Sequence, residues 1–315
     1  MNAIFATILP VFGLIAAGYL AARVNYIKAE ASSGIAQFVF NLAMPALLFR
    51  TVAGMEQAAA SPWNLSLGLF SGLAIVWGLT MLLARFVTSE QGGGTAALCM
   101  AATFGNIAML GLPLSLAHFG AAAALPVSLV LSVHAPLLWL AAVLHYETGR
   151  HQRLPSVPQL VRQLLRELLR NPIVLALLGG AVWHWAGLTL HPVPDRMLEL
   201  LGSAGIPAAL VALGLSLAGY SLKGQWSAIT LVIAMKMLVT PLVIWLIFTY
   251  AVPVPPLWKQ IAVMLAVMPT GANAYLFAKR YEQEAPAISG AIAAGTALAV
   301  ITTSVLLTVL EAGYM

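Results

Sequence analysis

The sequence predicts an all-α integral membrane protein with ten transmembrane helices, arranged as two inverted repeats of five helices each. Three observations predict this fold class: an apolar composition, a repeat at a fixed offset, and a one-sided distribution of basic residues. Of the 315 residues, 61% are apolar and 8% are charged, whereas soluble domains carry about 25% charged residues. A soluble core could not absorb this much apolar surface, so we place the chain in a lipid bilayer.

Apolar segments that are long enough to cross the bilayer recur along the whole chain. A helix needs about 20 apolar residues to cross roughly 30 Å of hydrocarbon. The ten predicted spans cover residues 2–22, 32–54, 63–87, 95–118, 121–145, 172–190, 197–221, 226–250, 257–281 and 286–310. The longest polar stretch, 147–171, predicts a cytoplasmic linker between a first repeat, 1–146, and a second repeat, 172–315.

Residues of the first predicted repeat recur in the second at an offset of 162 positions. The recurring residues are Pro10, Gly18, Pro45, Ala46 and Leu48, which return as Pro172, Gly180, Pro207, Ala208 and Leu210. Two separate segments require the same offset, with no gap between them. Internal duplication in a polytopic membrane protein is typical of transporters whose substrate site lies at the interface between the repeats.

Basic residues gather on one side of the predicted topology. With the N-terminus outside, eleven Lys and Arg residues lie on the cytoplasmic side and three on the outer side. The positive-inside rule therefore predicts both termini outside, in the periplasm, for a multi-pass protein of the inner (plasma) membrane. Since five spans is an odd number, the second repeat enters the membrane upside down. The net charge of +5 follows from this topology and indicates no nucleic-acid partner.

Motifs of several other function classes are missing from the sequence. It contains no Gly-Lys-Ser/Thr phosphate loop, and its six His residues are scattered without a metal-binding spacing. We therefore expect no enzyme activity, no metal and no cofactor. A membrane sensor would need a cytoplasmic output domain, and the sequence contains none.

The fourth and ninth predicted spans carry helix-breaking residues at matching positions. These residues are Gly105, Asn106, Gly111 and Pro113 in one span and Pro269, Thr270, Gly271 and Asn273 in the other. Proline removes a backbone donor and disfavours a helical residue before it, and glycine makes unwinding easier. Irregular backbone within a bilayer must be buried in protein or line a wet cavity. The pair predicts two broken crossover helices that form a binding site; the alternative is two ordinary proline kinks.

Charge and dipoles in these spans favour an anionic substrate. The N-termini of interrupted helices attract carboxylates, and Asn106 and Asn273 add neutral donors. Lys236 lies deep inside a predicted span, which makes it a functional candidate unless its side chain snorkels to the cytoplasmic interface. Arg50 and Arg85 lie near span ends and are either membrane anchors or a second carboxylate contact.

These segments resemble the auxin efflux carrier family. The run Asn106 to Pro113 is similar to its fourth-helix crossover, and Pro269-x-Gly271 with Phe277-Ala278-Lys279 and Tyr281 is similar to its ninth. The run Asn41 to Phe49 resembles the second helix of bacterial members, and Lys236 matches a basic position in the eighth. Plant members have proline where this chain has Gly105, and they have a long central loop. The resemblance is therefore to the bacterial type.

The resemblance implies a secondary transporter that moves a small organic anion by an elevator mechanism. The anion would be a carboxylate or dicarboxylate such as malonate or malate, or an auxin-like acid. Helices 1, 2, 6 and 7 would form the scaffold and the surface of a homodimer, and helices 3–5 and 8–10 the moving transport domain. The expected substrate-binding residues are Asn41, Gly105, Asn106, Gly111, Pro113, Lys236, Pro269, Thr270, Gly271 and Asn273.

Two other function classes remain as alternatives. One is a sodium-coupled bile-acid-type symporter, and the other is an anion channel, which would need a continuous polar pore. No Asp or Glu lies deep in a predicted span, so the residues leave the energy source of transport open.

Overall fold

The structure is a computed structural model that describes residues 2–54, 62–88, 95–149 and 156–312. Within these ranges the chain is helical, with an isolated β-bridge and no strand, which confirms the all-α prediction. Seven helical runs of the described chain are long and apolar enough to cross a membrane. They are Ala6–Arg23, Ala31–Ala53, Trp63–Ala84, Ile107–Gly149, Pro192–Leu217, Trp226–Tyr250 and Ala285–Glu311. The protein is therefore a multi-pass membrane protein.

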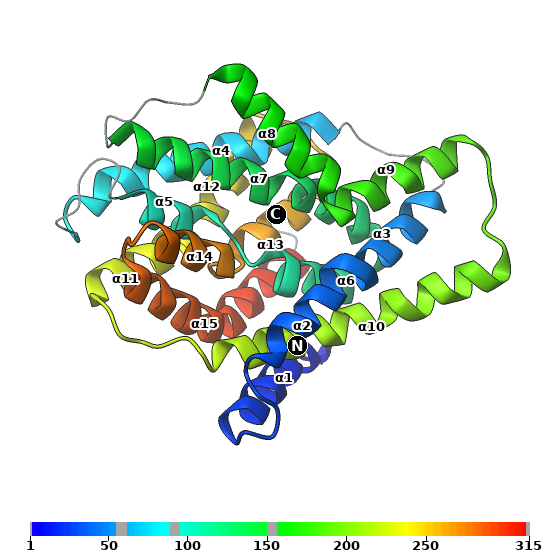
Figure 1. The fold of residues 1–315 in the computed structure, drawn as a ribbon, viewed down its shortest axis with the longest axis horizontal. Coiled ribbons are helices and arrows are strands. Elements are labelled where there is room, and N and C mark those ends of the chain that lie inside the picture. Colours follow the sequence, from blue (N-terminus) through cyan, green and yellow to red (C-terminus); the bar gives the residue numbers. More distant parts are fainter. Residues whose placement is uncertain (1, 55–61, 89–94, 150–155, 313–315) are drawn as a thin grey trace. The chain divides into compact units, whose positions relative to one another are not determined.

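The chain divides into two compact units, and each is discontinuous in sequence. The first unit comprises Met1–Ser61, Ala108–Ser132 and Arg166–Gly219. Its helical elements are α1 (Asn2–Arg23), α2 (Ala31–Phe38), η1 (Val39–Ala43), α3 (Met44–Ala53), most of η3 (Ile107–Gly111), α6 (Leu112–Phe119), η4 (Gly120–Ala123), the start of α7 (Ala124–Gly149), α9 (Pro172–Trp185) and α10 (Pro192–Leu217). In this unit α3 lies along α9, and α1 lies along α10 (Figure 1).

The contact between α1 and α10 depends on two glycines that let the backbones approach. A Cβ atom at Gly214 would lie 2.0 Å from the carbonyl oxygen of Ile15, and one at Gly18 would lie 2.3 Å from that of Val211. No side chain fits at either distance. Small residues are a common means of close helix packing in membranes, and here they join the first and seventh predicted spans.

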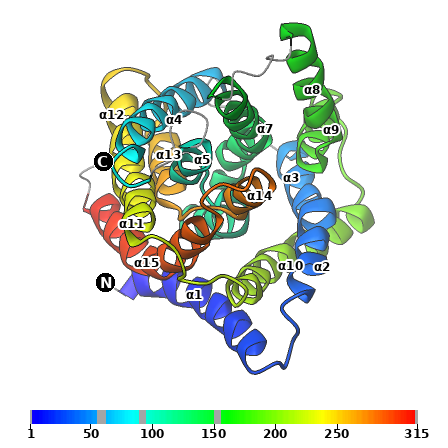
Figure 2. The same ribbon diagram turned by 60° about the vertical axis from the view of Figure 1, so that its left-hand side comes forward.

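The second unit comprises Pro62–Ile107, Val133–Leu165 and Tyr220–Met315. Its elements are α4 (Pro62–Ala84), α5 (Ala96–Thr103), the rest of α7, most of α8 (Val157–Arg170), α11 (Trp226–Ala234), η5 (Met235–Val239), α12 (Thr240–Tyr250), α13 (Pro256–Val267), α14 (Ala272–Arg280) and α15 (Ala285–Glu311). In Figure 2 the short helices α5 and α13 lie inside a ring that includes α4, α11 and α12. Every residue of α5 is buried, so this helix is surrounded by protein.

Three segments of π-helix interrupt the helices, and a proline follows each of them at the same distance. Pro45, Pro113 and Pro241 each stand two residues after η1, η3 and η5 respectively. A proline lacks the backbone donor and its ring clashes with the carbonyl four residues earlier, which accounts for a local widening of the helix. Such π-bulges are frequent at functional sites. Asn41 lies in η1, Lys236 in η5, and Asn106 directly before η3.

The region between the predicted repeats differs from the expected polar linker. The helix α7 continues to Gly149, and Val157–Arg170 forms the separate helix α8; residues 150–155 lie outside the described part of the chain. Leucines recur there at spacings of three and four residues, which is the period of a helix. The polar composition of the stretch does not reveal this period. The stretch therefore contains a helix that the composition alone did not predict.

Candidate functional site

The fourth and ninth predicted spans are interrupted where the sequence predicts, and their backbones pair with each other. Gly105, after the end of α5, and Thr270, after the end of α13, form an antiparallel β-bridge. Its two hydrogen bonds are Asn106 N–H to Pro269 O at 2.8 Å and Gly271 N–H to Phe104 O at 2.9 Å. The bridge thus pairs four backbone groups at the point where the helices supply no partner.

The last carbonyl groups of α5 and α13 receive hydrogen bonds from side chains of η5 and α12. Lys236 Nζ donates to the carbonyl of Ala266 at 2.5 Å. The Thr240 hydroxyl is shared between the carbonyl of Met235, at 2.7 Å, and that of Ala102, at 3.2 Å. The terminal carbonyls of a helix lack partners within it and carry a partial negative charge that favours a cation. Lys236 is therefore held at the broken end of α13.

The Lys236 side chain is buried, and within the described part of the chain no carboxylate forms a salt bridge with it. The residue is 1% exposed, which excludes snorkelling to an interface. The salt bridges of the described chain involve Arg50 and Arg196, and Lys236 takes part in none of them. Within the described ranges, no three His, Cys, Asp or Glu residues are grouped as a metal site. The site therefore presents a buried lysine amine that has no acidic partner among the described residues.

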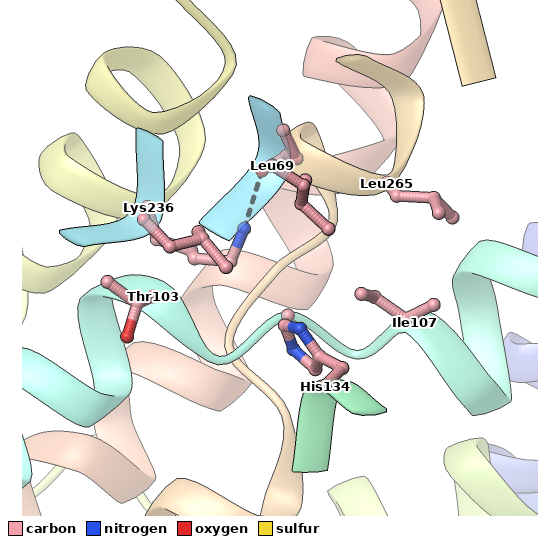
Figure 3. A pocket seen from close by; sticks show the side chains of 9 residues that line it. Leu69, Thr103, Ile107, His134, Lys236 and Leu265 are labelled. Carbon is pink, nitrogen blue, oxygen red and sulfur yellow. Dashed lines mark hydrogen bonds between the residues drawn. The ribbon is translucent and has the colours of Figure 1, made fainter. Parts of the chain in front are cut away.

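Lys236 and His134 line one small cavity within the second unit (Figure 3). The other lining residues come from α4, α13 and the crossover: Leu69, Leu73, Thr103, Gly105, Ile107, Leu265 and Ala266. The cavity has room for about one water molecule. Its walls are mainly apolar, so the ammonium group and the imidazole ring are its main polar features.

His134 is a candidate residue that the sequence analysis missed. It lies in α7 and is 3% exposed, and its ring lies 4.8 Å from the ring of Phe104, centroid to centroid. Both ring nitrogens are buried without a hydrogen-bond partner in the described chain. The six histidines carry no ligand spacing, so only the position of His134 in the middle of the fifth predicted span could have singled it out.

The two asparagines stand at the starts of the second halves of the broken helices. Asn106 is 8% exposed and directly precedes η3. Asn273 is half-buried in the first turn of α14. Gly111 and Pro113 are buried residues of the first unit, and Asn41 is an exposed residue of the same unit. The second unit thus contains seven of the ten expected site residues: Gly105, Asn106, Lys236, Pro269, Thr270, Gly271 and Asn273.

The two arginines near predicted span ends have local partners. The Arg50 guanidinium forms two hydrogen bonds to the Asp195 carboxylate, at 2.7 and 3.1 Å. The guanidinium carbon of Arg85 lies 4.7 Å from the ring centroid of Phe86. Because Asp195 already neutralises Arg50, these contacts favour structural roles over a second carboxylate contact.

Comparisons with known proteins identify the chain as a membrane transport protein. The family described as "Membrane transport protein" matches residues 3–307. A protein of Rhizobium meliloti (strain 1021) described as "Putative malonate transporter" is 28% identical over 99% of this chain and 98% of its own. "Auxin efflux carrier component 8" of Arabidopsis thaliana is 22% identical over 93% of this chain and 94% of its own. The resemblance to the auxin efflux carrier family is confirmed, and the relatives are transporters rather than enzymes.

Proposed function

The chain belongs to the membrane transport protein family, and we propose that it carries a small organic anion, a carboxylate or dicarboxylate such as malonate or malate. The observation that carries this proposal is the buried Lys236 side chain, which lines a cavity at the crossover and has no acidic partner among the described residues. A buried cation is unfavourable unless an opposite charge compensates it. An anionic substrate supplies that charge each time it binds.

The asparagines and the half-helix N-termini extend the proposed site. The second halves of both broken helices begin next to the bridge between Gly105 and Thr270. Their backbone donors and positive dipole ends favour carboxylate oxygens. Asn106 and Asn273 add neutral donors at the same two ends. The site then stabilises an anion mainly with dipoles, and Lys236 provides the full charge.

We propose an elevator mechanism, in which one unit carries the site across the membrane past the other. The division into two units supports it, because the predicted scaffold helices 1, 2, 6 and 7 belong to the first unit. The predicted transport helices belong to the second unit except for residues 108–132, which group with the first. In this proposal the chain crosses the inner membrane ten times as two inverted repeats. Both termini lie in the periplasm. The scaffold helices form the surface of a homodimer.

Malonate is the first substrate to test, since a relative that matches nearly the whole chain carries malonate in its description. The purified protein is reconstituted in vesicles, and uptake of labelled malonate, malate and indole-3-acetate is measured with and without a sodium gradient. We expect saturable uptake of a carboxylate that excess unlabelled acid competes away. Unitary currents would identify a channel, and strict dependence on sodium would favour a sodium-coupled symporter.

A further inference from the structure

We propose that His134 and Lys236 together bind one carboxylate group of the substrate, with the imidazole N–H as the second donor. This inference rests on the proposed function and deepens it. The two side chains come from different helices, α7 and the segment η5, and line the same cavity (Figure 3). No sequence pattern predicts that they lie together.

The unpaired groups in this cavity define the chemistry of the missing partner. A neutral imidazole carries one N–H donor and one acceptor nitrogen, and neither has a partner in the described residues. The Lys236 ammonium has three N–H donors, and one of them is bound to Ala266. Buried polar groups without partners are unfavourable. A carboxylate accepts several hydrogen bonds and compensates the charge, so it pairs with the imidazole N–H and with the Lys236 ammonium at once.

The size of the cavity fits one end of a carboxylate. A single water fits the cavity, and a carboxylate oxygen is of similar size. Displacing such a water leaves affinity intact only when the ligand reproduces its hydrogen bonds, and a carboxylate oxygen can do so with both donors. The rest of the substrate then extends toward the asparagines and the half-helix ends.

Substitutions of His134 test this inference. Malonate binding is measured by thermal stabilisation of the purified protein, and uptake is measured in vesicles. We expect His134→Leu to weaken malonate binding about tenfold or more, because it removes a hydrogen bond to a charged group. His134→Gln keeps a donor and should bind within about threefold of wild type. His184→Leu, in α9 of the first unit, is the matched control and should bind as wild type does.

A second measurement follows malonate binding in the wild-type protein and uses His134→Gln only to assign a resonance. With ¹⁵N-labelled histidine, malonate should shift the ring resonances that His134→Gln removes. An unshifted His134 resonance, or wild-type affinity in His134→Leu with lost affinity in Asn106→Ala, would overturn this inference and leave the proposed function standing. If no organic acid stabilises the wild-type protein, both this inference and the proposed function are wrong.

A different observation carries a second inference: we infer that α8 lies flat on the membrane surface and binds anionic lipid headgroups. Apolar side chains recur at spacings of three and four residues and form one stripe: Leu160, Val161, Leu164, Leu165, Leu168 and Leu169. Of these, Val161, Leu165 and Leu169 are between 49% and 60% exposed. The other face carries Arg162, Arg166 and Arg170 with one acidic residue, Glu167.

The length and the charge of α8 favour a lipid surface as the partner. The helix has 14 residues, too few to cross about 30 Å of hydrocarbon. A helix with one apolar face and a basic polar face lies in the interface plane, with the apolar face in the acyl boundary. Each basic residue near an anionic membrane surface strengthens the attraction. In the chain α8 stands between α7 and α9, which keeps it close to the bilayer.

Spin labels on the full-length protein in nanodiscs test this placement. A label at Leu165→Cys should be more accessible to oxygen than to a water-soluble nickel chelate, and one at Arg162→Cys should show the reverse. Cys99, the single native cysteine, is buried and should not react. Equal water accessibility at both positions would overturn the inference. So would protection of Leu165→Cys from both reagents, since a protein surface would then cover the stripe.

Lipid charge provides the second test. Phosphatidylglycerol should raise the melting temperature of the wild-type protein more than phosphatidylcholine does. Replacing Arg162, Arg166 and Arg170 with glutamine should abolish most of that difference, whereas Lys223→Gln, an exposed cation outside α8, should preserve it. An unchanged lipid preference in the triple variant would overturn the lipid assignment.

Discussion

Gly105 and Thr270 face each other in an antiparallel bridge that joins two broken helices of the second unit. Four helix ends meet around the bridge: the ends of α5 and α13 and the starts of η3 and α14. The first halves, α5 and α13, end in carbonyls that Thr240 and Lys236 bind. The second halves begin at the two asparagines, and the first backbone donors there, Asn106 N–H and Gly271 N–H, pair across the bridge. In the proposed site, Lys236 lies at the carbonyl end of α13, and the anion binds at the starts of the two second halves.

The bridge has little room for a side chain at Gly271. A Cβ atom there would lie 2.9 Å from Phe104 Cδ1 and 3.1 Å from the carbonyl oxygen of Gly105. We therefore expect Gly271→Ala to cost about 1–3 kcal/mol of stability and to weaken malonate binding, because the bridge must open. Gly78→Ala in α4, where nothing lies within 4 Å, is the control. Thermal unfolding measures the stability of both variants, and malonate titration measures their affinity. Wild-type stability and affinity in Gly271→Ala would contradict the tight fit.

The asparagines should act on binding more than on stability. Asn106→Ala and Asn273→Ala each remove an amide donor at the start of a half-helix, without adding polarity to the membrane. We expect malonate affinity to fall about tenfold in each variant, since a hydrogen bond to a charged ligand contributes roughly 1.5–3 kcal/mol. Vesicle uptake and thermal unfolding measure the two effects separately. Wild-type affinity in both variants would remove the asparagines from the site.

The sequence predicted the crossover because its cause is local. Proline and glycine close together weaken a helix locally, so the interruptions in the fourth and ninth predicted spans could be located from residues alone. A single proline does not suffice, since Pro10, Pro136 and Pro207 lie inside continuous helices. The bridge between Gly105 and Thr270 joins segments more than 160 residues apart, and no local rule pairs them. His134 was missed for the same reason. Its role depends on a neighbour, Lys236, that only the folded chain brings to it.

The orientation of the chain is tested by labels on either side of α10. Leu188→Cys and Lys223→Cys are both exposed and flank this helix. The positive-inside rule places Lys223 in the cytoplasm and Leu188 outside. An impermeant maleimide added to intact cells should therefore label Leu188→Cys, and Lys223→Cys only after lysis. Labelling of both positions from outside would contradict the proposed topology.

In the proposal Lys236 supplies a positive charge to the anion and donates a hydrogen bond to the end of α13. A matched pair of variants separates these two roles. Lys236→Gln removes the charge and the bond to Ala266. Thr240→Val removes a hydroxyl that is shared between the carbonyls of Met235 and Ala102, and it leaves the charge. We expect Lys236→Gln to abolish carboxylate uptake with little loss of stability, because the desolvation of the cation disappears with it. Thr240→Val should cost about 1–3 kcal/mol through an unpaired carbonyl and keep its affinity for malonate.

A third variant distinguishes charge from shape at this position. Lys236→Arg retains the charge, but a guanidinium is planar and less strongly hydrated than an ammonium, so we expect only part of the uptake to return. Initial rates at several malonate concentrations, with protein amounts matched by immunoblot, give the comparison. If Lys236→Gln transports dicarboxylates at the wild-type rate and affinity, Lys236 serves only to cap the broken end of α13. The anion would then be held by the asparagines and the half-helix ends.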